Sequence, residues 1–171
     1  FFRNEPQFKT LKEKILPEIV RRKGQGSRVK GQGEKPVIRI WSAGCSSGEE
    51  PHSIAMVAHE ALRKHPGTNL KILATDLSIR MLARAKLGLY DPHRVGTVPA
   101  DYKQRYFQKT EDDGRPMLQL VPELRRLITF ARFNLMSPTF PFRQGFHVIF
   151  CRNVMIYFDR PTQQTLVNKF A

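Results

Sequence analysis

The stretch that decides the fold is Val37–Pro51, with the sequence Val-Ile-Arg-Ile-Trp-Ser-Ala-Gly-Cys-Ser-Ser-Gly-Glu-Glu-Pro. Its first part, from Val37 to Trp41, is a β-rich apolar run, which is typical of a strand. From Ala43 to Gly48 the residues are small, so a ligand can approach the backbone closely. Pro51 suits the first turn of a helix, where its missing N–H is tolerated. The order strand, tight turn, helix predicts the nucleotide-binding corner of a Rossmann-like α/β sheet.

The helix after this turn is supported by an apolar repeat at helical spacing, formed by Ile54, Val57, Ala58, Ala61 and Leu62. The turn itself lacks the full G-x-G-x-x-G spacing and the Lys-Ser/Thr of a phosphate-gripping loop, so a ligand without phosphates fits better. Glu49 and Glu50 agree with this, because carboxylates at a helix start repel phosphate. One of them can bind a ligand ammonium. The alternative, that both only stabilise the helix start, stays open.

The composition predicts one hydrophobic core with a small appendage, because 40% of the 171 residues are hydrophobic. No run of 18 apolar residues and no signal peptide is present, so we expect a cytoplasmic protein without membrane insertion. Cys45 and Cys151 are expected to be reduced thiols. The five histidines lack the spacing of metal ligands, so no metal is predicted. The net charge of +14 favours an acidic partner: nucleic acid, an anionic membrane surface or an acidic protein.

The N-terminal part predicts a helix from Glu5 to Lys23 that Pro17 breaks or kinks near Leu16. The glycine-rich, basic stretch from Gly24 to Lys35 is interpreted as a solvated connector rather than a binding element. The chain begins inside what looks like a motif and ends abruptly, so we expect it to be a piece of a longer protein.

Three further strands are predicted, over Leu70–Thr75, Leu127–Phe133 and Phe146–Cys151. Ligands of open α/β sheets lie beyond the carboxyl ends of the strands, so the residues that follow each strand are site candidates: Asp76, Asn134, Arg152 and Asn153. Asp76 can accept both ribose hydroxyls of a nucleoside, and it also suits the cap of the next helix.

A small antiparallel insertion is predicted from about Val95 to Arg126, before the third main strand. The turn signal Asp112-Asp113-Gly114 stands between two β-rich runs, which is the pattern of a hairpin.

Taken together, these stretches resemble the family of CheR-type chemoreceptor glutamate methyltransferases. The matching segments run in the family's order along nearly the whole chain: Phe1-Phe2-Arg3 with Phe8, Trp41 to Gly44, Gly48 to Pro51, Ala74 to Asp76, Arg105 to Phe107, Phe133 to Leu135, and Phe150 to Phe158. The last of these is the most specific.

The resemblance implies a class I methyltransferase sheet that binds S-adenosylmethionine and releases S-adenosylhomocysteine, with no metal. It implies three segments: 1–94 as the first part of the cofactor-binding domain, 95–126 as an inserted β-subdomain, and 127–171 as the continuation. An N-terminal helical domain and later strands are expected outside the chain. The implied cofactor residues are Arg3, Ala43, Gly44, Glu50 with Glu49 as the alternative, Asp76, Asn134, Leu135, Arg152 and Asn153.

The implied reaction is methyl transfer to glutamate carboxylates in the helical cytoplasmic domain of a chemoreceptor. Arg3 and Tyr157 are the implied catalytic residues, and no general base is needed because the acceptor is ionised at pH 7. Two alternatives are kept. One is a module that senses the cofactor or acts as a scaffold without turnover. The other is a nucleic-acid methyltransferase, which the charge suggests and which Arg152-Asn153-Val154-Met155 at the fourth strand argues against.

Overall fold

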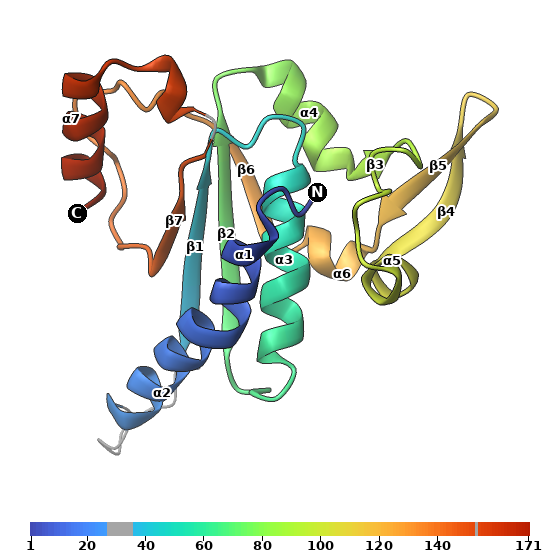
Figure 1. Ribbon diagram of the computed structural model, residues 1–171, viewed down its shortest axis with the longest axis horizontal. Helices are drawn as coiled ribbons and strands as arrows, with labels where there is room; N and C mark the ends of the chain where they lie inside the picture. Colours follow the sequence, from blue (N-terminus) through green and yellow to red (C-terminus); the bar gives the residue numbers. More distant parts are fainter. Residues whose placement is uncertain (27–35, 153) are drawn as a thin grey trace.

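The computed structural model describes residues 1–26, 36–152 and 154–171. Its centre is a four-stranded parallel sheet in the order β6-β2-β1-β7 (Figure 1). The strands are β1 (Val37–Ala43), β2 (Asn69–Asp76), β6 (Ile128–Arg132) and β7 (Val148–Phe150). The chain moves outward from β1 to β6 and then returns to the other side of β1. This reversal creates the crevice in which α/β sheets bind ligands, and it confirms the predicted fold class.

The two faces of the sheet are covered by different apolar clusters, because side chains alternate along β1. Ile38 and Ile40 lie in a large cluster under α3 (Glu49–Leu62) and the N-terminal helices. Trp41 and Ala43 lie in a second cluster with α7 (Arg160–Phe170). The Trp41 indole N–H also donates to Thr75 Oγ1 at 2.9 Å, which ties β1 to β2. Apolar clusters thus pack against both faces of the sheet.

Of the predicted break or kink near Leu16, the break is wrong, and the kink stays a prediction. The N-terminal helix runs on through α1 (Glu5–Thr10), the π-helical turn η1 (Leu11–Ile15) and α2 (Leu16–Gly26). Proline cannot donate the usual bond to the carbonyl four residues earlier. The wider turn absorbs this loss, because the Leu16 N–H bonds back to the Leu11 carbonyl. The predicted connector falls mostly on residues 27–35, which lie outside the described residues.

A second, antiparallel sheet precedes β6 and consists of β3 (Leu89–Tyr90), β5 (Arg115–Leu120) and β4 (Phe107–Asp112). The hairpin turn Asp113-Gly114 has φ angles of 49° and 71°, as the predicted Asp-Gly signal requires. Short helices flank this sheet: α5 (Ala100–Tyr106) and α6 (Pro122–Arg125). Strand β3 lies before the predicted start at Val95, and the division of the chain into 1–94, 95–126 and 127–171 stays a prediction.

Candidate functional site

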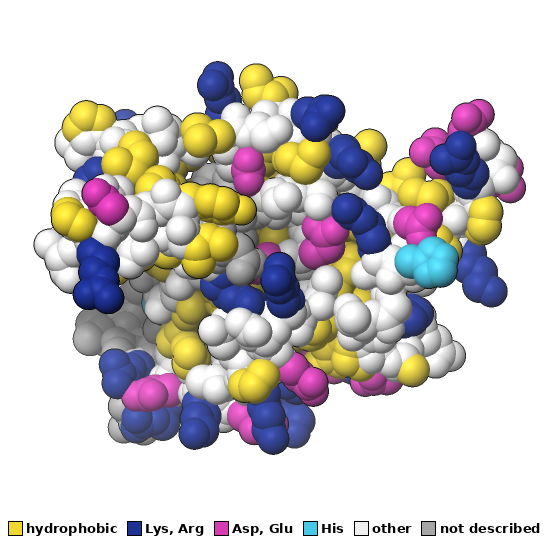
Figure 2. Space-filling model, turned by 45° about the horizontal axis from the view of Figure 1, so that its top comes forward, with side chains coloured by type: hydrophobic (Ala, Val, Ile, Leu, Met, Phe, Trp, Pro, Cys, Tyr) yellow, Lys and Arg dark blue, Asp and Glu magenta, His cyan; other side chains and the backbone are white. Residues whose placement is uncertain are grey.

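A cavity of about 530 Å³ lies where β1, β2 and β7 end. Seven of the predicted site residues line it: Arg3, Gly44, Glu49, Glu50, Asp76, Arg152 and Tyr157. They come from the N-terminal segment, from the turn and helix after β1, and from the segments after β2 and β7. Figure 2 looks toward this end of the molecule and shows acidic and basic side chains next to one another.

The loop Gly44–Gly48, called loop 44–48 below, has an unusual backbone. Gly44, Ser46 and Gly48 all have positive φ, at 82°, 49° and 96°. A Cβ on Gly44 would lie 2.1 Å from a methyl carbon of Val154, so only glycine fits there. The Gly44 and Cys45 amides both donate to the Thr75 carbonyl at 2.8 Å. The loop is therefore held against the end of β2.

Asp76 fixes the loop from the other side. Its Oδ2 accepts the Ser46 N–H at 2.8 Å, and its Oδ1 accepts the Ser78 N–H at 2.9 Å. The cap of α4 (Ile79–Leu87) is Ser78, whose hydroxyl accepts the Met81 N–H. A carboxylate oxygen has room for two hydrogen bonds, so both oxygens of Asp76 keep acceptor capacity toward the cavity.

The two adjacent glutamates have different surroundings. Glu49 accepts from the Ser47 hydroxyl at 2.7 Å and pairs with Arg94 at 2.8 Å. Glu50 accepts from the Ser42 hydroxyl at 2.8 Å and, among the described residues, forms no ion pair. Burial raises the pKa of the Glu50 carboxyl, an effect that Ser42 and the charge of Arg152 partly offset. Glu50 is thus the carboxylate that a cationic ligand would stabilise most.

The N-terminal segment closes one side of the cavity. The Arg152 guanidinium donates to the Arg3 carbonyl at 2.5 Å, and the Phe2 N–H donates to Ser53 Oγ at 3.1 Å. Tyr157, in the short helix η2 (Met155–Tyr157), is 80% exposed at the edge of the site. Burial raises the pKa of the Cys45 thiol to about 12, so this lining residue stays protonated and is no nucleophile.

Three described site candidates, Ala43, Asn134 and Leu135, are not among the residues that line the cavity, and a fourth candidate is not described. Ala43 and Leu135 are buried in the second apolar cluster. Asn134 is exposed, and its side-chain oxygen accepts the Met136 N–H at 2.9 Å. Asn153 lies outside the described residues. The cofactor role of these four stays a prediction.

Arg94 was not predicted as a site residue, whereas Ser46 lies in the predicted small-residue turn from Ala43 to Gly48. Arg94 pairs with Glu49 across 45 positions of the chain, and no local pattern signals such a contact. Ser46 contributes its backbone N–H, which follows from the turn rather than from the residue type. In the described ranges, no group of three or more acidic, histidine or cysteine side chains is arranged to hold a metal, and no helix is long and apolar enough to cross a membrane.

Comparison with known proteins gives a consistent result. Residues 1–171 match the family profile described as CheR methyltransferase, SAM binding domain. A chemotaxis protein methyltransferase of Borreliella burgdorferi is 43% identical over 172 residues, which cover 99% of this chain and 57% of the relative. A probable chemotaxis protein methyltransferase of Rhizobium etli is 40% identical over 171 residues, covering 100% of this chain and 60% of the relative. The chain thus spans somewhat less than two thirds of the length of these relatives.

Proposed function

The chain belongs to the CheR methyltransferase family, whose SAM-binding domain it matches, and from this membership we propose that the protein methylates glutamate side chains of chemoreceptors. The methyl donor is S-adenosylmethionine, and the products are glutamate methyl esters and S-adenosylhomocysteine. One observation carries the proposal: the cavity at the switch point of the sheet gathers Arg3, Glu50, Asp76, Arg152 and Tyr157.

The described lining suits this donor, which carries an ammonium group and two ribose hydroxyls. We assign the ammonium to Glu50 because Glu49 is already paired with Arg94. A cation beside Glu50 favours the ionised carboxylate and offsets the cost of its burial. We assign the ribose hydroxyls to Asp76, whose oxygens keep acceptor capacity. No metal takes part.

When bound, S-adenosylmethionine supplies an electrophilic methyl group. The residues of the chain orient the acceptor carboxylate and exclude water, and no proton is removed, because the acceptor is already ionised. Arg3 holds either the acceptor carboxylate or the carboxylate of the donor, and Tyr157 donates a hydrogen bond next to the methyl group. Arg152 positions Arg3 through the Arg3 carbonyl. The exposure of Tyr157 suits a contact that forms when the acceptor docks.

The proposed partner is the acidic helical domain of a chemoreceptor in the cytoplasm. The net charge of +14 supports an acidic partner. On the face in Figure 2 the basic side chains are spread among acidic ones rather than joined in one patch, which favours an acidic protein over nucleic acid.

The test is calorimetric titration of the full-length protein with S-adenosylhomocysteine, next to the same titration with NADH. We expect micromolar binding of the first ligand alone. Asp76→Ala should weaken that binding by 1.5–3 kcal/mol, which is about 10- to 150-fold, the usual worth of hydrogen bonds to a charged group.

The matched control is Asp91→Ala. Asp91 also accepts a backbone N–H through its carboxylate, but it does not line the 530 Å³ cavity, so affinity should not change. Unchanged affinity in Asp76→Ala would remove Asp76 from the ribose role. A wild-type protein that binds no S-adenosylhomocysteine would end the enzyme proposal and favour the scaffold alternative.

A further inference from the structure

A buried hydrogen-bond chain connects the small antiparallel sheet to loop 44–48. The Tyr90 hydroxyl, on β3, lies 2.9 Å from the Ser47 carbonyl and 2.6 Å from Nδ1 of His52. A phenol has one hydrogen, and the carbonyl can only accept it. The His52 Nδ1 must therefore donate to the Tyr90 oxygen. This order fixes the tautomer of His52 and the direction of both bonds.

The environment of His52 keeps this order constant. The imidazole is fully buried at the start of α3, and its Nε2 has no hydrogen-bond partner in the described part of the chain. Burial, together with the positive charge of Arg125, lowers the pKa of His52 to about 3. The ring is thus neutral wherever the protein works, and its Nδ1 hydrogen stays directed at Tyr90.

Loop 44–48 needs such support, because backbone with positive φ at a residue other than glycine persists only where its surroundings determine it. Ser46 is such a residue, and Asp76 holds its N–H. Tyr90 holds the carbonyl of the following residue, Ser47, so two adjacent residues of the loop each have a backbone group fixed by a side chain. A Cβ on Gly48 would lie 2.9 Å from the Tyr90 oxygen, so the phenol also packs directly against the loop.

We propose that Tyr90 is a positioning residue for cofactor binding: through Ser47 it sets the shape of loop 44–48 and aims the Ser46 amide at Asp76. The small sheet is then a working part of the cofactor site, because β3 pairs with β5 at Tyr90↔Leu118. Arg94, four residues after Tyr90, supports the same loop from its outer side through Ser47 Oγ at 3.2 Å. The inference rests on the proposed cofactor role of the loop.

The experiment compares Tyr90→Phe with Tyr106→Phe in the full-length protein. Both tyrosines are buried and both contact a histidine Nδ1 of α3, but Tyr106 bonds to His59 rather than His52 and does not line the 530 Å³ cavity. Hydrogen–deuterium exchange without cofactor should be about tenfold faster at amides 44–48 in Tyr90→Phe only, because a buried carbonyl loses its donor. Affinity for S-adenosylhomocysteine should fall about tenfold, with kcat at saturating S-adenosylmethionine within about twofold.

A second variant, Arg94→Gln, tests the same inference if Tyr90→Phe does not fold. Arg94 is half-exposed, so its replacement should leave the fold intact. It should speed exchange at amides 44–48 about threefold. Unchanged exchange at these amides in both variants, or exchange that rises equally along β2 and the rest of the chain, would overturn the inference. If the wild-type protein binds no S-adenosylhomocysteine, the proposed function fails and the cofactor role of Tyr90 fails with it, while the exchange at amides 44–48 separately shows whether Tyr90 sets the shape of the loop.

Discussion

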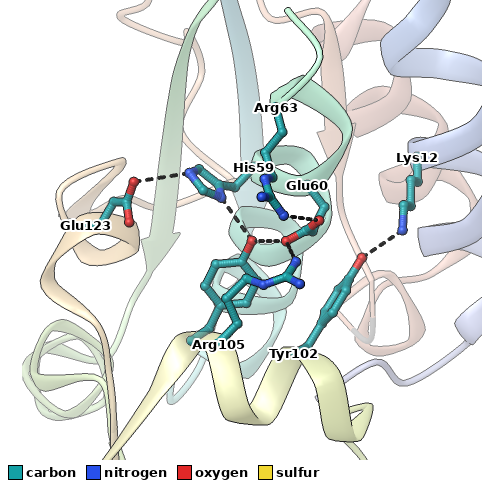
Figure 3. A network of polar contacts seen from close by, with 8 residues as sticks. Lys12, His59, Glu60, Arg63, Tyr102, Arg105 and Glu123 are labelled. Carbon is teal, nitrogen blue, oxygen red and sulfur yellow. Dashed lines mark hydrogen bonds and ion pairs between the residues drawn. The ribbon is translucent and has the colours of Figure 1, made fainter. Parts of the chain in front are cut away.

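Helix α3 presents two histidines seven residues apart on one face, and each bonds to a tyrosine of the small antiparallel sheet or of the helix that flanks it. His52 meets Tyr90 at 2.6 Å, and His59 meets Tyr106 at 2.9 Å. In the described part of the chain, the first pair continues through the Tyr90 hydroxyl to a backbone carbonyl, that of Ser47. The second pair is connected to Glu60, which accepts hydrogen bonds from Tyr106 and Arg105 and forms an ion pair with Arg63. His59 also lies 3.3 Å from the Glu123 carboxylate (Figure 3).

The two histidine–tyrosine pairs therefore have different roles. The His52 pair is buried and uncharged, so it can hold a fixed backbone shape next to the cavity. The His59 pair belongs to a charged network that is partly open to solvent and joins α3 to α5 and α6 (Figure 3). We infer that the first end of α3 serves the site and the second end serves the attachment of the small sheet.

The largest expected effect on the free energy of unfolding comes from adding a methyl group at Gly48, next to the start of α3. In Gly48→Ala the new Cβ would lie 2.8 Å from Ala85 Cβ and 2.9 Å from the Tyr90 oxygen, at a φ of 96°. Strain and overpacking should lower the free energy of unfolding of the full-length protein by about 2–4 kcal/mol in urea titrations. The control is Gly67→Ala, beyond the other end of α3, where nothing lies within 4 Å. It should change stability by less than about 1 kcal/mol; equal losses would contradict the contrast.

The sequence predicted the parts of this arrangement that depend on local pattern. Strand and helix periodicity located β1 and α3, and the rule that parallel strands end at one edge brought Glu50 and Asp76 together. Strand β3 was missed because two residues form no pattern. Pro17 predicted a disturbance near Leu16 but not its form, because a helix can widen for one turn instead of ending. The Tyr90 to Ser47 bond joins positions 43 residues apart, and only packing determines such a contact.

The second effect concerns pH. An unfolded histidine titrates near pH 6.5, while folded His52 has a pKa of about 3. Below pH 6.5 the unfolded chain therefore binds a proton that the folded chain does not, so this group's contribution to stability is complete above pH 6.5 and declines toward pH 3. At pH 5 the loss amounts to about 2 kcal/mol. His52→Gln removes the titrating group and should lose about 2 kcal/mol less than the wild type between pH 7.5 and 5.

The hydroxyl group bonded to His52 does not change its charge between pH 7.5 and 5. Tyr90 has a pKa raised by burial and stays neutral across this range. At the other end of α3, hydrogen bonds from Tyr106 and Arg105 overcome the effect of burial and lower the pKa of Glu60, so this carboxylate is ionised throughout the window. A variant that loses as much stability as the wild type between the two pH values would show that His52 is not held neutral.

The smallest effect tests the second end. Glu60→Gln removes the negative charge that Arg105, Arg63 and Tyr106 share, and the partly solvated arginines limit the loss of unfolding free energy to about 1 kcal/mol at pH 7.5. Since the folded pKa of Glu60 is lowered, this difference from the wild type should decline as the pH falls below about 4.3, where an unfolded glutamate titrates, and vanish once folded Glu60 is protonated. Affinity for S-adenosylhomocysteine should not change. Weaker binding in Glu60→Gln would mean that the charged network also shapes the cofactor site, and the division between the two ends of α3 would be wrong.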